Sequence, residues 1–88
     1  MWRVPKDWRL EWRQWGSFHI VFNPASGDTH LLNVISAFVL RSLENEARSV
    51  EELKALVSRL PERPGDPADI DDLVSELDEL GLVAAAPP

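Results

Sequence analysis

Six carboxylates lie between residues 69 and 79, and they form the densest group of possible metal ligands or acid–base residues in the chain. Asp72, Glu76 and Glu79 recur at helical spacing and would share one helix face, where their oxygens could hold a divalent cation. Acidic residues near a helix N-terminus are also favoured by the helix dipole. This explanation is the simpler one, so we expect neither a metal ion nor a cofactor here.

Two histidines, His19 and His30, fall in segments with strand-like composition. In the pairing proposed below they would be diagonal neighbours on one face of a hairpin, which suggests a metal site or a pH-sensitive pair. Two ligands are too few for a metal, and the chain has no cysteine to complete the set. We therefore expect both histidines to line a binding face.

All four tryptophans occur in the first fifteen residues. Tryptophan is common among the residues that anchor protein interfaces, but large rings also fill cores. Trp8 and Trp12 lie on an alternating apolar and polar stretch, which favours core positions for them. For Trp2 the sequence favours neither role.

The chain offers no motif for catalysis. It lacks a glycine-rich phosphate loop, a serine or threonine in a nucleophile context, and metalloprotease motifs, so we expect it not to be an enzyme. Residues 1–48 carry six Lys/Arg against five Asp/Glu, a charge of +1, whereas residues 49–88 carry three against ten, a charge of −7. A charge of −7 argues against binding nucleic acid. No apolar run is long enough for a membrane span or signal peptide, which favours a cytoplasmic protein.

The first half of the chain predicts three antiparallel strands. Residues 8–15 alternate apolar and polar side chains, and residues 18–22 are rich in β-branched and aromatic types. Residues 23–28 hold Asn, Pro, Ser, Gly and Asp, which predict a turn that places Phe22 near Thr29. The strand at 29–32 would then have one free edge unless the strand at 8–15 covers it.

The second half predicts three helices. Asn33 is a good N-cap for residues 34–43, and Ser49 with Glu52 forms a capping box for the helix that follows. Pro61 to Pro67 should form a loop, after which Asp66 or Asp69 would cap a helix that ends in a Schellman motif at Gly81. Residues 84–88 should fray. The fold class is α+β and winged-helix-like, a three-stranded antiparallel N-terminal sheet followed by three helices, in one domain over residues 1–88 with an ordered core at about 8–83.

The stretch FHIVFNPASGDTHLLN at 18–33, the helix at 34–43, the helix start at 49–53 and the ending ELDELGLV at 76–83 together resemble the PqqD family. More narrowly, they are similar to short PqqD-like peptide chaperones that occur beside an HPr-kinase-related protein. The resemblance covers about residues 8–83. It implies a recognition element for ribosomally made, modified peptides, which holds the leader segment of a precursor and presents it to a modifying enzyme.

The resemblance also implies where the peptide binds, as an extra strand on the third strand and against the third helix. Carried over by position, the backbone pairing would come from Asp28, Thr29, His30, Leu31 and Leu32. The wall of the groove would come from Ile70, Leu73, Val74 and Leu77. An unpaired strand beside an apolar helix suits strand addition on physical grounds as well. Since a domain this small needs the same helix for its core, we expect Leu73, Leu77 and Leu80 to be largely core.

Two alternatives remain open. A winged-helix regulator could read DNA with the helix at 70–80, although that segment carries carboxylates and no Lys or Arg. A regulatory subunit of a kinase-like enzyme, with no peptide ligand, would use similar apolar patches and edges. The chain could also form a homodimer by pairing its free strand edges.

Overall fold

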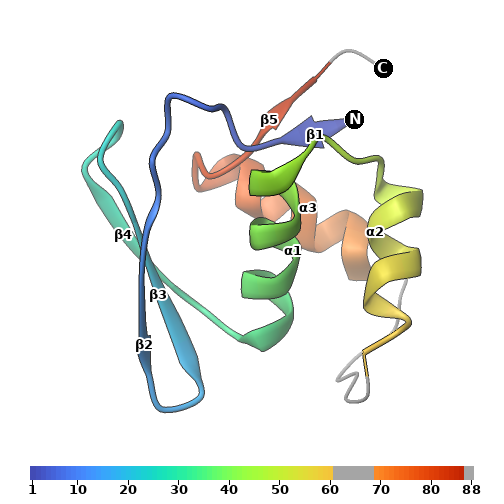
Figure 1. The fold of residues 1–88 in the computed structure, drawn as a ribbon, viewed down its shortest axis with the longest axis horizontal. Coiled ribbons are helices and arrows are strands. Elements are labelled where there is room, and N and C mark those ends of the chain that lie inside the picture. The colour runs from blue at the N-terminus through green and yellow to red at the C-terminus, as the bar shows by residue number, and fades with distance from the viewer. Residues whose placement is uncertain (61–68, 87–88) are drawn as a thin grey trace.

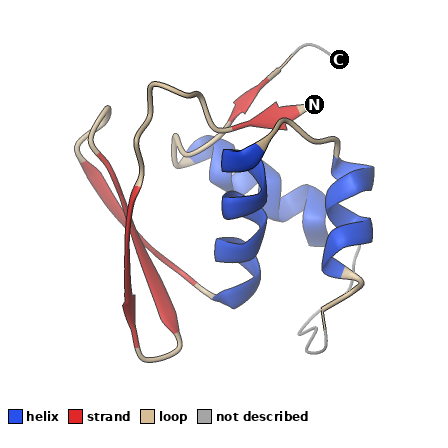
Figure 2. Ribbon diagram, viewed as in Figure 1, coloured by secondary structure: helices blue, strands red, loops and turns tan. Residues whose placement is uncertain are grey.

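The computed structural model describes residues 1–60 and 69–86 (Figures 1 and 2). Its strands are β1 (Trp2–Arg3), β2 (Glu11–Trp15), β3 (Phe18–Asn23), β4 (Asp28–Leu32) and β5 (Ala84–Ala85), and its helices are α1 (Val34–Asn45), α2 (Val50–Val57) and α3 (Asp69–Glu79). Strands β2, β3 and β4 form an antiparallel sheet in that order, and the helices follow it in sequence. The predicted α+β class, a three-stranded sheet followed by three helices, is confirmed.

The register of the sheet puts alternate residues on opposite faces. Val21 lies across from Trp12 on one side and from His30 on the other, and Phe22 lies across from Thr29, as predicted. The predicted start of the first strand at Trp8 is wrong, because β2 begins at Glu11. The backbone amides before β2 form hydrogen bonds in local turns and not in the sheet. The Trp8 amide donates to the Pro5 carbonyl at 2.9 Å, and the Leu10 amide donates to the Trp8 carbonyl at 3.0 Å.

A second, two-stranded sheet joins the chain ends and was not predicted. Trp2 pairs with Ala85, and the Ala86 amide donates to the Met1 carbonyl at 2.7 Å. Trp2 also exchanges two backbone hydrogen bonds with Arg48, of 2.8 and 2.9 Å. The expectation that the chain frays from Ala84 onward is therefore wrong for residues 84–86, because their backbone groups find partners across the molecule. Pro87 and Pro88 lie outside the described residues.

Side-chain and backbone caps set the helix ends. The Asn33 Oδ1 accepts from the Ser36 amide at 2.8 Å, and Ser49 and Glu52 form both bonds of the capping box. At the end of α3 the Leu82 amide donates to the Leu77 carbonyl and the Gly81 amide to the Asp78 carbonyl, both at 3.0 Å, which is the predicted Schellman pattern. Gly81 has the left-handed φ of 76° that this motif requires. The predicted loop at 61–67 and the candidate cap Asp66 lie outside the described residues, and Asp69 is already the first residue of α3.

The three helices lie on one side of the three-stranded sheet, and the core fills the space between them (Figures 1 and 2). The core takes side chains from the inner sheet face, all three helices and the segment after α3: Val4, Val21, Leu32, Ile35, Ala37, Val39, Leu40, Leu43, Leu53, Val57, Ile70, Val74, Leu77, Leu82 and Val83. Trp2, Trp8 and Trp12 are partly buried against this core, whereas Trp15 is 77% exposed. None of the helices in the described ranges is long and apolar enough to span a membrane.

A polar contact fastens β2 to α1. The Trp12 indole Nε1 donates to the Glu44 Oε1 at 2.8 Å, and the Arg41 guanidinium carbon lies 4.2 Å from the centroid of a Trp12 ring, within cation–π range. Shielding of the carboxyl end raises the pKa of Glu44 above its usual range, although the residue as a whole stays exposed. The hydrogen bond from Trp12 and the charge of Arg41 act in the opposite direction.

We expect Trp12→Phe to raise the pKa of Glu44 further, because it removes a hydrogen bond that favours the ionised form. Because the pKa of Glu44 is higher in the folded state than in the unfolded state, protonated Glu44 stabilises the fold. This stabilisation is complete at a pH below the ordinary carboxyl pKa and is lost as the pH rises through the raised value. Carboxyl carbon NMR titration of both proteins measures the shift. Trp8→Phe is the control, because Trp8 is also partly buried. An unchanged Glu44 pKa in Trp12→Phe would show that the indole bond has no such effect.

Candidate functional site

Strand β4 forms one edge of the three-stranded sheet. Among the residues that the structure describes, it pairs with β3 alone, so its other side is left with unpaired backbone groups. Its one charged side chain is that of Asp28, the first residue of the strand. The opposite edge, β2, carries Glu11 and Arg13, and charges of this kind discourage strand addition. Of the two edges, β4 is therefore the better place for a guest strand.

Side chains alternate along β4, as they must on a strand. Thr29 and Leu31 point to the outer face of the sheet and are exposed, whereas His30 is partly buried and Leu32 is buried on the helix side. Asp28 is exposed at the start of the strand. The structure thus brings the five predicted backbone-pairing residues, 28–32, onto one free edge.

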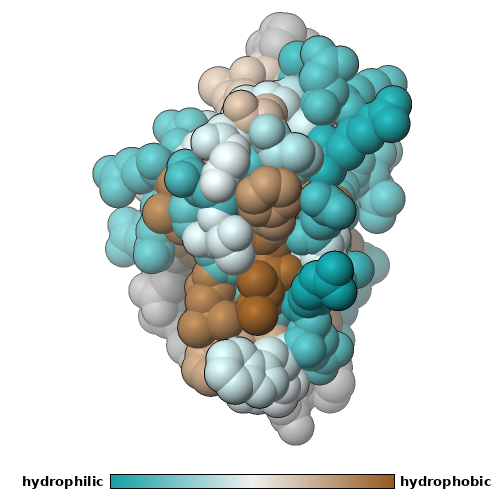
Figure 3. All heavy atoms as spheres, turned by 90° about the vertical axis from the view of Figure 1, so that its left-hand side faces the viewer, coloured by the Kyte–Doolittle hydropathy of each residue, from teal (hydrophilic) through white to brown (hydrophobic). Residues whose placement is uncertain are grey.

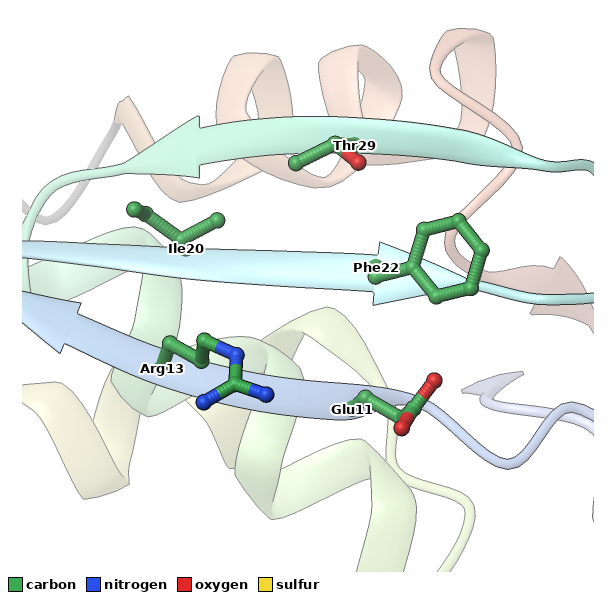
Figure 4. A pocket seen from close by; sticks show the side chains of 5 residues that line it. All are labelled: Glu11, Arg13, Ile20, Phe22 and Thr29. Atoms are coloured by element: carbon green, nitrogen blue, oxygen red, sulfur yellow. The ribbon is translucent and has the colours of Figure 1, made fainter.

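Helix α3 passes behind β4 when the sheet is seen from its outer face (Figure 4). Of the four residues predicted to line the groove, Ile70, Val74 and Leu77 are at most 3% exposed, and they belong to the core. Leu73 is only partly buried, as is Leu80, so both are less enclosed than expected. The apolar stripe of α3 is needed to close the core, and Leu73 is the one of the four that keeps accessible surface.

The charged side of α3 faces solvent. Asp71, Asp72, Glu76, Asp78 and Glu79 are all exposed. Lys54 of α2 contacts one of them, with its Nζ 3.4 Å from the Asp71 Oδ2. Within the described ranges no group of three His, Cys, Asp or Glu residues is arranged to hold a metal ion.

Asn23 connects the turn before β4 to the end of α3. Its side chain is fully buried, its Nδ2 donates to the Gly81 carbonyl at 3.2 Å, and its Oδ1 accepts from the Ala25 amide at 3.0 Å. The two bonds together hold the β3–β4 turn against the Schellman motif of α3. The sequence pattern predicts only a turn at Asn23, since nothing in it points to a partner fifty-eight residues away.

His19 and His30 lie on the inner face of the sheet as diagonal neighbours, which confirms the predicted register. The Nδ1 of His19 and the Nε2 of His30 are shielded from solvent and have no hydrogen-bond partner among the described residues. The side chain of His30 therefore lies on the helix side of β4 and not on the outer face of the sheet.

The outer face of the sheet is partly apolar. Figure 3 looks onto this side and shows a hydrophobic patch with hydrophilic side chains along its right border. A hollow of about 280 Å³ on this face is lined by side chains from all three strands: Glu11, Arg13, Ile20, Phe22 and Thr29 (Figure 4). Thr29 connects this hollow to the free edge.

No family model matches the chain, and no curated protein matches it in sequence. Two solved structures share its fold. The first is lasso peptide synthetase B1 complexed with the leader peptide, with a TM-score of 0.65 and 19% identity over 96% of this chain and 98% of that one. The second is TbiB1 in complex with the TbiA(beta) leader peptide, with a TM-score of 0.63 and 16% identity over 98% of this chain and 99% of that one. The chain therefore has the fold of these two proteins along nearly its whole length.

We expect Asn23→Ala to lower the free energy of unfolding by about 2 kcal/mol, because it removes two partly buried hydrogen bonds worth about 1 kcal/mol each. Asn33→Ala is the matched control and should cost about 1 kcal/mol through loss of an exposed helix cap. Urea unfolding gives both values. Only Asn23→Ala should shift the amide NMR signals of residues 79–82. Equal costs, or unmoved signals at 79–82, would contradict the role given to Asn23.

Proposed function

We propose that this chain is a non-catalytic peptide chaperone that binds the leader segment of a ribosomally made precursor peptide and presents it to a modifying enzyme. The leader is added as an antiparallel or parallel strand on β4. The observation that carries the proposal is the edge of β4, where main-chain groups have no partner among the described residues and no charged side chain follows Asp28. Backbone hydrogen bonds supply affinity, and the alternate side chains of the guest supply specificity.

The likeness to proteins with bound leader peptides supports this proposal. Both solved structures that share the fold are complexes with a leader peptide. The PqqD-like motifs at 18–33 and 76–83 support the same class of ligand independently of the fold. The HPr-kinase-related protein of that narrower group is the partner enzyme that the resemblance favours.

The burial of α3 refines the proposed site. Ile70, Val74 and Leu77 support the helix from within the core, and Leu73 is the member of the predicted wall that a guest can touch without unfolding the helix. Direct contacts to the guest then come mainly from β4 and its neighbours on the sheet.

A DNA-binding role is less well supported. The exposed side of α3 carries five carboxylates, and no Lys or Arg occurs between Asp69 and Glu79. A recognition helix of this composition would repel phosphates. A regulatory subunit that binds an enzyme without any peptide is a second candidate, and the free β4 edge favours the peptide-binding proposal over it.

The proposal is tested by selecting peptides from a displayed random library on the full chain and mapping the selected binders by amide NMR. We expect the signals of residues 28–33 to shift, while those of residues 11–15 on the opposite edge serve as an internal control. N-methylation of successive peptide residues should weaken binding about fivefold at every second position, because only alternate amides face β4.

Binders that leave residues 28–33 unperturbed would contradict the proposal. So would an N-methyl scan without the two-residue period, because strand addition requires it. A library that yields no binder would also count against a peptide-binding function.

A further inference from the structure

Three large apolar side chains are exposed together at one end of the outer sheet face. Trp15 is 77% exposed, Leu31 58% and Phe18 48%. With Gly16 and Ser17 they line a hollow of about 410 Å³ that contains no charged side chain. It lies on the face shown in Figure 3, and its size falls in the range of ligand pockets, about 300–1,000 Å³.

The hollow adjoins the edge at which a guest strand would pair. Its lining residue Leu31 belongs to β4, and Leu31 lies beside Ile20 of β3 on the outer face. A strand added to β4 would lie about 4.8 Å away, with alternate side chains on the outer face. The guest residue opposite Leu31 would contact Leu31, because directly opposite residues of neighbouring strands touch. Trp15 lies on β2, three strand spacings or about 14 Å from the guest strand, so only a large side chain that leans across Leu31 can reach the hollow.

We propose that this hollow binds a large apolar side chain of the guest peptide, aromatic or long aliphatic, from the residue that lies beside Leu31. This inference rests on the proposed strand addition to β4 and specifies what the guest must carry. The neighbouring hollow is different, because Glu11 and Arg13 line its far side, and a guest residue two positions away would lie beside Thr29 at its rim. The two hollows together make the outer face selective for an apolar residue at one end only.

A second copy of the chain fits this surface less well. An aromatic side chain has about 150–250 Å² of surface, so the exposed parts of Trp15, Phe18 and Leu31 together amount to a few hundred Å². A stable interface buries about 800 Å² per partner. The occupant that the geometry favours is therefore the guest.

The test is a double-mutant cycle on a peptide selected for binding to the full chain. The peptide residue beside Leu31 is identified by NMR contacts to the Leu31 methyl groups and replaced by Ala. The protein variants are Leu31→Thr and Trp15→Thr, with Arg13→Thr as the control on the same face outside the hollow. Since both variant positions in the hollow are exposed, thermal unfolding should stay close to wild type, which checks that the fold is kept.

We expect the peptide substitution and each hollow variant to weaken binding about tenfold, as loss of a buried large apolar side chain does. Each combination should be hardly weaker than the single changes, because both remove the same contact. Arg13→Thr should combine additively with the peptide change.

Additive effects at Leu31 and Trp15 would overturn this inference and leave strand addition standing, provided that the signals of residues 28–33 still shift. Wild-type protein that sediments as a dimer, with a monomeric Trp15→Thr variant, would also overturn it, since a second copy would then occupy the hollow. Failure of every selected peptide to perturb β4 would instead remove the proposed function itself.

Discussion

The buried side-chain amide of Asn23 is the contact on which the geometry of the candidate site depends. It is the only buried polar residue in the described part of the chain, and it joins the turn that starts β4 to the carbonyl that ends α3. A buried amide must find partners for its donors and acceptor or lose the free energy of desolvating them. Both partners are backbone groups, so the contact does not depend on the side chains at those positions. It holds the free edge of β4 in place relative to α3.

The two edges of the sheet differ in the charged side chains and contacts that protect them. Charged side chains protect β2, and the Trp12–Glu44 bond holds this strand against α1. Strand β4 carries a charge only at its first residue, Asp28, and it leads directly into the capped start of α1 at Asn33. A sheet edge with so little protection is an aggregation risk unless it has a partner, which is the physical reason to connect it with peptide binding.

The charge of the molecule is divided between its two halves. Five exposed carboxylates lie on α3, whereas the outer face of the sheet combines apolar residues with one cation and one anion, Arg13 and Glu11. With one charge of each sign, this face of the sheet does not strongly repel a peptide of either charge. The division of charge also keeps the acidic helix available for solvation, which suits a small domain with a net charge of −6.

Local patterns in the sequence determined most of the elements. Caps at Asn33 and Ser49, the Schellman stop at Gly81 and the turn between Phe22 and Thr29 all act over a few residues, so the residue types there were sufficient to predict them. The sequence left open whether the strand at 8–15 covers the edge of β4, and the structure decided this by pairing β2 with β3. The tertiary structure alone decided the pairing of Trp2 with Ala85, the long-range bond of Asn23, and which apolar residues of α3 are buried. Each of these depends on segments that are distant in sequence, and periodicity shows that a helix has an apolar face but not whether the core or a ligand covers it.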